Sequence, residues 1–274
     1  LRLRGHHSTD AIVELFGDTL ESLELGDCIA PLTPLSRIPS LRSLTLTGAN
    51  TTELISELHE LTQLQSLNLP RLDPPDLDDL TALRLRELSC SVMPAQLAAR
   101  LPLLRELEAL TIHAVEGGAL DLSPLAELPR LRRLVVPGEL RGRLTLPAGF
   151  EYLAVSEATG PVPIEGEVAE LGVFRCDPRW LSAGLLERVR GLRYYWNDPL
   201  HDDALAQLPR LTPSLERLDV YCSRDDWAWP DAAETLGALP QLRSLDWTSE
   251  DMQQLAERSR MLPELCLLHE DWPR

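Results

Sequence analysis

The pattern L-x-x-L-x-L recurs along the whole chain and constrains its fold more than any other feature. Successive copies begin 18 to 27 residues apart. In most copies the fourth and sixth positions are apolar and the residue between them is polar or small, which is typical of a short β-strand with one apolar face. About twelve copies are present, and their first positions are Leu20, Leu41, Leu64, Leu85, Leu107, Leu131, Phe150, Val168, Val189, Leu215, Leu242 and Leu265.

One such strand cannot bury its apolar face alone. Stacked copies can, because each strand pairs with the next in a parallel sheet and the leucines of neighbouring copies form a continuous core. We therefore expect the first, fourth and sixth residues of each copy to be buried. The residues that test this most directly are Leu44, Leu67, Leu110, Leu134 and the inward-placed Trp247. The 59 leucines and the hydrophobic fraction of 44% supply enough apolar surface to exclude a disordered chain.

The chain resembles the leucine-rich repeat family over its whole length. The family motif extends to an Asn or Cys at the ninth position, which Cys28, Cys176 and Asn197 match and the other copies do not. In the family that side chain turns inward and satisfies loop backbone groups, so its loss predicts irregular loops here. The resemblance implies an α/β fold: a right-handed leucine-rich repeat solenoid (horseshoe) with a concave parallel β-sheet and a mixed helical and irregular convex side.

The segments that return the chain between strands carry their own signals. Apolar residues have helical spacing in residues 52–61, 95–101, 181–189, 203–208 and 252–258. The proline-containing returns at residues 31–34 and 74–75 are instead predicted to be turns or 3₁₀ segments. The convex side is therefore expected to mix helical and irregular segments.

The copies near residues 137–168 are shorter, are rich in Gly and Pro, and lack a helical return. This stretch is expected to form a flatter, thin-walled part of the solenoid. A small domain boundary is the alternative. Because the leucine pattern persists through the stretch, we predict a single domain covering residues 1–274.

Charge and amino-acid usage indicate the class of partner, the cellular compartment and the source of the protein. The chain has a formal net charge of −17 and all its basic residues are Arg, so nucleic acid and anionic membranes are not expected partners. Five cysteines, without a terminal cluster, favour a reduced, cytoplasmic protein. The absence of Lys suggests a GC-rich, bacterial source. The chain begins at Leu1 without a Met and inside a repeat, so an upstream segment is expected.

The sequence contains no motif for catalysis or metal binding. The P-loop, nucleophile-elbow, zincin and C-x-x-C patterns are all absent, and no Lys is available for Schiff-base chemistry. His6 and His7 are adjacent and are expected to point in different directions, His59 is expected on the surface of a helical return, and His113 lacks a partner nucleophile. We predict a protein that is not an enzyme and needs no cofactor and no metal.

The concave face is the one place where the sequence indicates a site. The fifth and seventh positions point away from the core, so equal positions in successive copies form columns about 4.8 Å apart. The columns hold small polar residues in the first half of the chain and aromatic or charged residues in the second. The residues that stand out are Phe174, Tyr195 and Tyr221 at seventh positions, Arg193, Asp219 and Asp246 at fifth positions, and Arg175 and Trp196 at eighth positions.

Exposed aromatic rings beside Arg are typical of protein interfaces. We therefore predict a non-catalytic module that binds a protein or peptide of basic or mixed charge on the concave face, with Arg193 paired to Asp219 and Asp246 free for a partner cation. Alternatively, the rings cap the sheet or contact a loop at residues 224–230. Two other roles stay open: a sensor or scaffold part of a larger effector or immune-like receptor chain, and a substrate-presenting accessory protein of an enzyme.

Overall fold

The computed structural model describes residues 1–4, 8–26, 31–48, 56–72, 74–158, 160–196, 206–222, 232–248 and 266–267. The chain divides into two compact units, residues 1–137 and 138–274. The division falls at the start of the Gly- and Pro-rich stretch near residues 137–168. That the whole chain is one domain stays a prediction, and the two units are described in turn.

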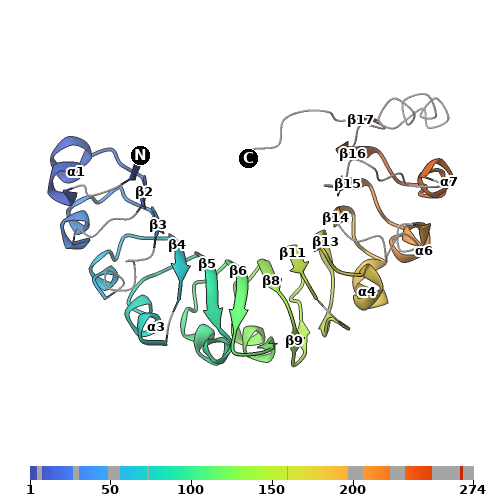
Figure 1. Cartoon of the computed structure of the whole chain (residues 1–274), viewed down its shortest axis with the longest axis horizontal. Coiled ribbons are helices and arrows are strands. Elements are labelled where there is room, and N and C mark those ends of the chain that lie inside the picture. Colours follow the sequence, from blue (N-terminus) through green and yellow to red (C-terminus); the bar gives the residue numbers. More distant parts are fainter. Residues whose placement is uncertain are drawn as a thin grey trace. The chain divides into compact units, whose positions relative to one another are not determined.

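The first unit is built on a parallel sheet whose strands are paired in chain order. Figure 1 shows strands β2 to β8 in that order, from blue to green, with the helical returns all on one side of them. The strands are β1 (Arg2–Arg4), β2 (Ser22–Gly26), β3 (Ser43–Thr47), β4 (Ser66–Arg71), β5 (Glu87–Pro94), β6 (Ala109–Glu116) and β8 (Arg133–Pro137), and a short β7 (Leu120–Asp121) lies in a return.

The register of this sheet follows the leucine pattern. The fourth positions face one another from strand to strand, in the series Leu23, Leu44, Leu67, Leu88, Leu110 and Leu134. Every one of these side chains is at most 1% exposed. The prediction that first, fourth and sixth positions form the core is confirmed for the six copies that begin at Leu20 to Leu131, because all of their residues at these positions are buried. Leu1, in the partial copy at the start of the chain, is 43% exposed.

The returns of the first unit are mostly 3₁₀ segments. They are α1 (Thr9–Phe16), η1 (Thr33–Arg37), η2 (Leu58–Glu60), α3 (Pro74–Leu80), η3 (Ala95–Leu103) and η4 (Ser123–Glu127). The 3₁₀ form of η1 agrees with the prediction. The prediction for residues 74–75 is wrong, because these prolines open an α-helix, where the missing N–H would have no intrahelical partner. Residues 95–101 have helical spacing but form a 3₁₀ helix, and of residues 52–61 only 56–61 are described.

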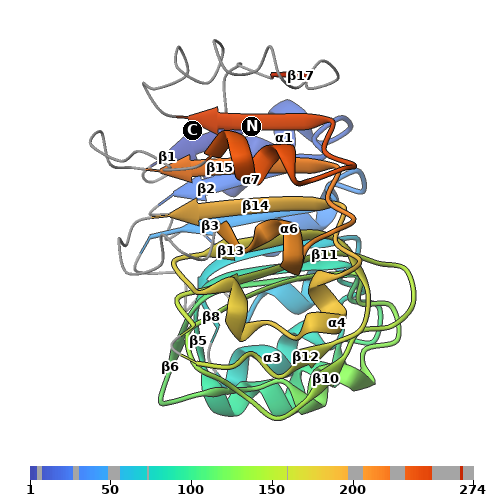
Figure 2. The same ribbon diagram turned by 90° about the vertical axis from the view of Figure 1, so that its right-hand side faces the viewer.

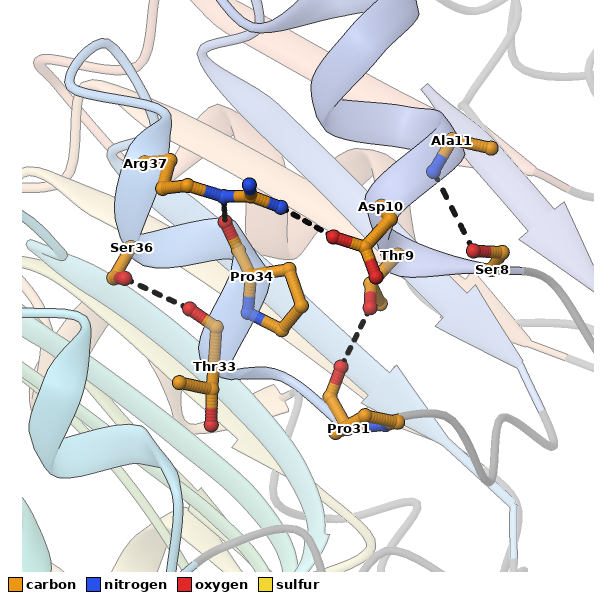
Figure 3. A network of polar contacts seen from close by, with 9 residues as sticks. All are labelled: Ser8, Thr9, Asp10, Ala11, Pro31, Thr33, Pro34, Ser36 and Arg37. Atoms are coloured by element: carbon orange, nitrogen blue, oxygen red, sulfur yellow. Dashed lines mark hydrogen bonds and ion pairs between the residues drawn. The ribbon is translucent and has the colours of Figure 1, made fainter.

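The first two returns are held together by polar contacts (Figure 3). The Ser8 side chain caps the N-terminus of α1. The Thr9 hydroxyl donates to the carbonyl of Pro31 at 2.7 Å, and Arg37 of η1 forms an ion pair with Asp10. Helix α1, which the sequence pattern did not single out, is thereby fastened to the next repeat.

The second unit continues the same plan with a parallel sheet of six strands, β11 (Phe150–Ser156), β13 (Val168–Phe174), β14 (Gly191–Trp196), β15 (Arg217–Cys222), β16 (Ser244–Thr248) and β17 (Cys266–Leu267). Figure 2 shows β14 and β15 pointing in the same direction. The returns contain η5 (Pro178–Trp180), α4 (Ala183–Leu186), α6 (Leu208–Leu211) and α7 (Ala232–Gly237).

The short repeats of the second unit return without a helix. Between residues 138 and 177, apart from the undescribed residue 159, the returns are extended and contain β9 (Leu140–Arg141), β10 (Leu144–Thr145) and β12 (Ile164–Glu165). Strands β10 and β12 pair in parallel, with Leu144 opposite Ile164. The prediction that these short repeats return without a helix is confirmed. That the stretch is flatter than the rest of the chain stays a prediction.

The core of the second unit follows the pattern as well. Leu153, Leu171, Leu192 and Leu218 face one another at fourth positions and are at most 1% exposed. At the ninth position, Cys176 is buried, and its thiol contacts the carbonyl oxygen of Val155 at 3.7 Å. Where the family residue is missing, apolar side chains turn inward instead, as the buried Leu72, Met93 and Ala158 show. The side chain of Trp247, as well as residues 28, 197, 203–205 and 252–258, lies outside the described part.

Candidate functional site

The face of the sheet opposite the core and the returns is here called the open face. In the second unit its seventh positions carry Phe174, Tyr195 and Tyr221, called the aromatic row. The strand register places Tyr195 directly opposite Phe174 on one side and Tyr221 on the other. The three rings therefore come from three consecutive strands.

The rings of the aromatic row contact one another. The Phe174 and Tyr195 rings are stacked, with centroids 4.3 Å apart and an interplanar angle of 25°. The Tyr195 and Tyr221 rings are tilted by 43°, with centroids 5.2 Å apart. Tyr221 is 46% exposed. The prediction that these rings lie side by side on the face of the sheet is confirmed.

The fifth positions form a charged row beside the rings: Arg193, Asp219 and Asp246. Asp219 lies opposite Arg193 on one side and Asp246 on the other. Arg193 Nε lies 3.5 Å from an Asp219 carboxylate oxygen, which confirms the predicted lateral pair. Among the residues that the structure describes, Asp246 forms no ion pair.

A third column, at the third position of each repeat, was missed by the sequence reasoning. In the second unit it carries Tyr152, Glu170 and Arg217, called the third-position group. Arg217 forms an ion pair with Glu170 and has its Nε 4.0 Å from Asp219. The guanidinium of Arg193 lies over the Tyr152 ring, 5.7 Å from its centroid. The strand alternation that singled out positions five and seven also puts position three on the open face, so the signal was present.

Two glycines provide space for these side chains. A Cβ at Gly172 would lie 2.7 Å from the Phe174 ring and 2.8 Å from the Tyr152 hydroxyl. A Cβ at Gly191 would lie 2.7 Å from the carboxyl carbon of Glu170. The missing side chains in β13 and β14 therefore let larger neighbours lie flat across the sheet.

The environment shifts three titratable groups of the site. Burial raises the pKa of Tyr152 and of Tyr195, although the nearby Arg193 acts in the opposite direction in both. Burial likewise raises the pKa of Asp219; Arg217 and Arg193 lower it, while Asp246 and Glu170 raise it further. The charged row is thus partly desolvated.

Arg175 and Trp196 occupy the ends of the strands. Arg175 has left-handed backbone (φ 50°), as does the equivalent Glu157 (φ 54°), and their side chains form an ion pair at 3.2 Å. The Arg175 N–H donates to the Tyr195 carbonyl at 3.1 Å, which extends the ladder beyond β13. Arg175 is therefore placed beside the aromatic row by its backbone, and its guanidinium pairs outside the charged row. The Trp196 side chain lies outside the described part.

The remaining candidates give no second site. His59 and His113 are both exposed. Within the described ranges, no group of three or more His, Cys, Asp or Glu side chains is arranged to hold a metal ion. No helix in the described part of the chain is long and apolar enough to cross a membrane.

Comparison with known proteins gives fold-level similarity only. No protein-family model matches the chain, and no curated protein matches it by sequence. Internalin C2 from Listeria monocytogenes is 18% identical, with a TM-score of 0.32 over 85% of this chain and 72% of that chain. The TLR13–ssRNA13 complex gives 14% identity and a TM-score of 0.46, over 83% of this chain and 39% of that chain.

The leucine-rich repeat ectodomain of the receptor kinase GASSHO1/SCHENGEN3 from Arabidopsis thaliana is 15% identical, with a TM-score of 0.37 over 98% of this chain and 43% of that chain. The assignment depends on the chain's own geometry: one strand per L-x-x-L-x-L copy, parallel pairing in register, and burial of the repeated leucines. By these features the chain has a leucine-rich repeat fold.

Proposed function

We propose that the chain is a non-catalytic binding module and that the open face of its second unit binds a protein or peptide through the aromatic row. The observation that carries this proposal is a contiguous row of three rings in contact on the side of the sheet away from the core, ending in the 46% exposed Tyr221. Such rings bury large areas on binding at a small cost in side-chain entropy.

Stability of the fold is a weak reason for the aromatic row. The leucine core lies on the opposite face, and in the first unit β2 and β3 pair with the small residues Gly26 and Thr47 at their seventh positions. An aromatic pair contributes only about 0.5–1.5 kcal/mol beyond its buried area. A partner that covered the rings would gain the burial that the free protein lacks.

The charge of the chain favours a partner of basic or mixed charge. A formal net charge of −17 accelerates encounter with cations and opposes binding to polyanions. The TLR13 structure is a complex with the single-stranded RNA ssRNA13. Single-stranded RNA is therefore a necessary comparison ligand, and our proposal expects it not to bind.

A reduced, cytoplasmic setting belongs to the same proposal. Burial raises the pKa of the Cys90 and Cys176 thiols to about 12, so both behave as apolar core groups. Both are free cysteines. Neither depends on an oxidising compartment for its structural role.

The test is a selection of displayed random peptides on the immobilised chain, with the Tyr195→Ala/Tyr221→Ala variant as the counter-target. Phe16→Ala is the matched control, because Phe16 is 38% exposed and lies on α1 in the first unit. Selected peptides should bind wild type and Phe16→Ala equally and the double variant at least about tenfold more weakly. Peptides that bind all three proteins equally, or a labelled RNA homopolymer that outcompetes the peptides, would overturn the proposal.

A further inference from the structure

The charged side chains on and beside the open face include one more carboxylate than guanidinium groups. Arg175 pairs with Glu157, Arg193 with Asp219, and Arg217 with both Glu170 and Asp219. These six charged groups and Asp246 comprise three guanidinium groups and four carboxylates on and beside the two rows and the third-position group. Asp246 is the one of these four carboxylates that forms no ion pair with a described residue, so the local charge favours one more cation.

The most exposed ring of the aromatic row lies beside that carboxylate. Tyr221 and Asp219 are two residues apart on β15, and Asp246 lies opposite Asp219 on β16. Strand spacing and rise put the Tyr221 and Asp246 positions roughly 8 Å apart on the diagonal. A flat cationic group can contact the ring face with one side and the carboxylate with its edge across such a gap.

A tyrosine and an aspartate already hold a guanidinium elsewhere on the open face, although they lie on the more distant strands β11 and β15. The guanidinium of Arg193 lies over the Tyr152 ring, at 5.7 Å, while its Nε lies 3.5 Å from Asp219. There, a tyrosine and an aspartate on different strands hold one guanidinium between them. Tyr221 and Asp246 also place a tyrosine near an aspartate. Among the described residues, no guanidinium group of the chain forms an ion pair with Asp246 or lies over the Tyr221 ring.

Electrostatics favours occupation of this position by a cation. Asp246 is one of the groups that raise the pKa of Asp219, because the two carboxylates face each other on adjacent strands. A positive charge beside Asp246 would offset that repulsion. The gain is larger than at a fully solvated surface, because Asp219 is only 18% exposed.

We propose that the bound protein or peptide presents an arginine whose guanidinium stacks on Tyr221 and pairs with Asp246. This inference rests on the proposed function and names the chemistry that the same site recognises. Arginine is favoured over lysine because its planar group can stack and donate in fixed directions at the same time, whereas an ammonium is a compact, strongly hydrated charge.

The probes are peptides from the selection above, resynthesised with each arginine replaced in turn by citrulline, which is neutral and nearly isosteric, or by lysine. Affinities are measured by fluorescence anisotropy on wild type, Asp246→Asn and Asp18→Asn, the last being a matched control at an exposed aspartate in the first unit. Replacing one arginine by citrulline should weaken binding to wild type and to Asp18→Asn about tenfold or more. The same replacement should change binding to Asp246→Asn by less than about threefold. This difference would show that the arginine and Asp246 interact directly.

The outcomes separate the two proposals. If the peptides need Tyr195 and Tyr221 but bind Asp246→Asn as tightly as wild type, or contain no arginine, the proposed function stands and the arginine inference is wrong. If lysine replaces arginine without loss, stacking on Tyr221 is wrong. If no peptide depends on the two tyrosines, the proposed function itself fails. An arginine peptide whose citrulline form loses affinity only when Asp246 is intact supports both.

Discussion

Arg217 reaches across an entire strand to pair with Glu170. The two residues lie 47 positions apart in sequence, on β15 and β13, and the intervening residue on β14 is Gly191, which faces both of them in the register. The same arrangement occurs in the first unit, where Arg133 pairs with Glu87 at 2.8 Å across Ala109. A small residue at the third position of a repeat thus lets ion pairs span three strands.

This arrangement predicts a coupling that depends on Gly191. In wild type, a double-mutant cycle of Glu170→Gln and Arg217→Gln should give a coupling of about 1 kcal/mol, as expected of a partly exposed pair. In a Gly191→Val background the coupling should vanish, because the new side chain occupies the space of the Glu170 carboxylate. Urea unfolding of the cycle measures it, and an unchanged coupling in the Gly191→Val background would contradict the geometry.

Core leucines at equivalent repeat positions should contribute similarly to the free energy of unfolding. Leu110 and Leu134 are 1% and 0% exposed and face each other across β6 and β8. Truncating either to Ala should reduce the free energy of unfolding by roughly 2–5 kcal/mol, the sum of lost transfer energy and a cavity. Thr111→Ala is the control, because Thr111 follows Leu110 on β6 and lies on the open face opposite Val135, and it should cost under about 0.5 kcal/mol. A loss below about 1 kcal/mol for either leucine would refute its core position.

Two carboxylates should respond to pH with opposite signs. Burial raises the pKa of Asp219 in the folded state, so its contribution to stability is full at low pH and is lost as pH rises through the raised pKa. The stability of Asp219→Asn relative to wild type should therefore be higher at about pH 7 than at about pH 3. Urea midpoints at the two pH values test this.

Glu116 serves as the matched comparison. A hydrogen bond from Arg71 lowers the pKa of Glu116, so its contribution is present above the unfolded pKa and is lost as pH falls through the lowered folded value. The stability of Glu116→Gln relative to wild type should thus be lower at about pH 7 than at about pH 3. If the two variants shift in the same direction between these pH values, the assigned environments are wrong.

The buried thiols should be unreactive in the folded protein. Burial raises the pKa of Cys90 and Cys176 to about 12, and both side chains are at most 3% exposed. An alkylating reagent at neutral pH should leave both unmodified until denaturant is added, because the thiolate is scarce and access is blocked. Peptide mass spectrometry after timed labelling resolves the sites. Rapid labelling of either cysteine without denaturant would be inconsistent with its place in the core.

The sheet, its register and its core could be predicted from the sequence because each depends on a strict repeat. A shift by one residue would turn every leucine outward, so Leu44 and Leu67 leave little freedom in the alignment of β3 and β4. The seventh-position rings follow from the same register. Nothing comparable fixes the returns: Pro74 is compatible with a turn and with the first turn of a helix, and the packing of neighbouring repeats decides between them.

The charged part of the site was only partly predictable. The pairing of Arg193 with Asp219 joins neighbouring strands at one column, so register alone predicts it. The contact of Arg217 with Glu170 skips a strand and depends on the absent side chain of Gly191. A long side chain can pair with any of several groups within its reach, and the residues of single columns do not predict which one it pairs with.

The central claim is that the aromatic row binds a partner and is not needed for folding. The most direct measurement compares Tyr195→Ala/Tyr221→Ala with wild type in one affinity titration against a selected peptide and one thermal melt. We expect a nearly unchanged Tm and a loss of about 2 kcal/mol or more in binding, roughly thirtyfold in Kd. A variant that melts much earlier, or that binds the peptide as tightly as wild type, would show that the rings only support the sheet and would contradict the claim.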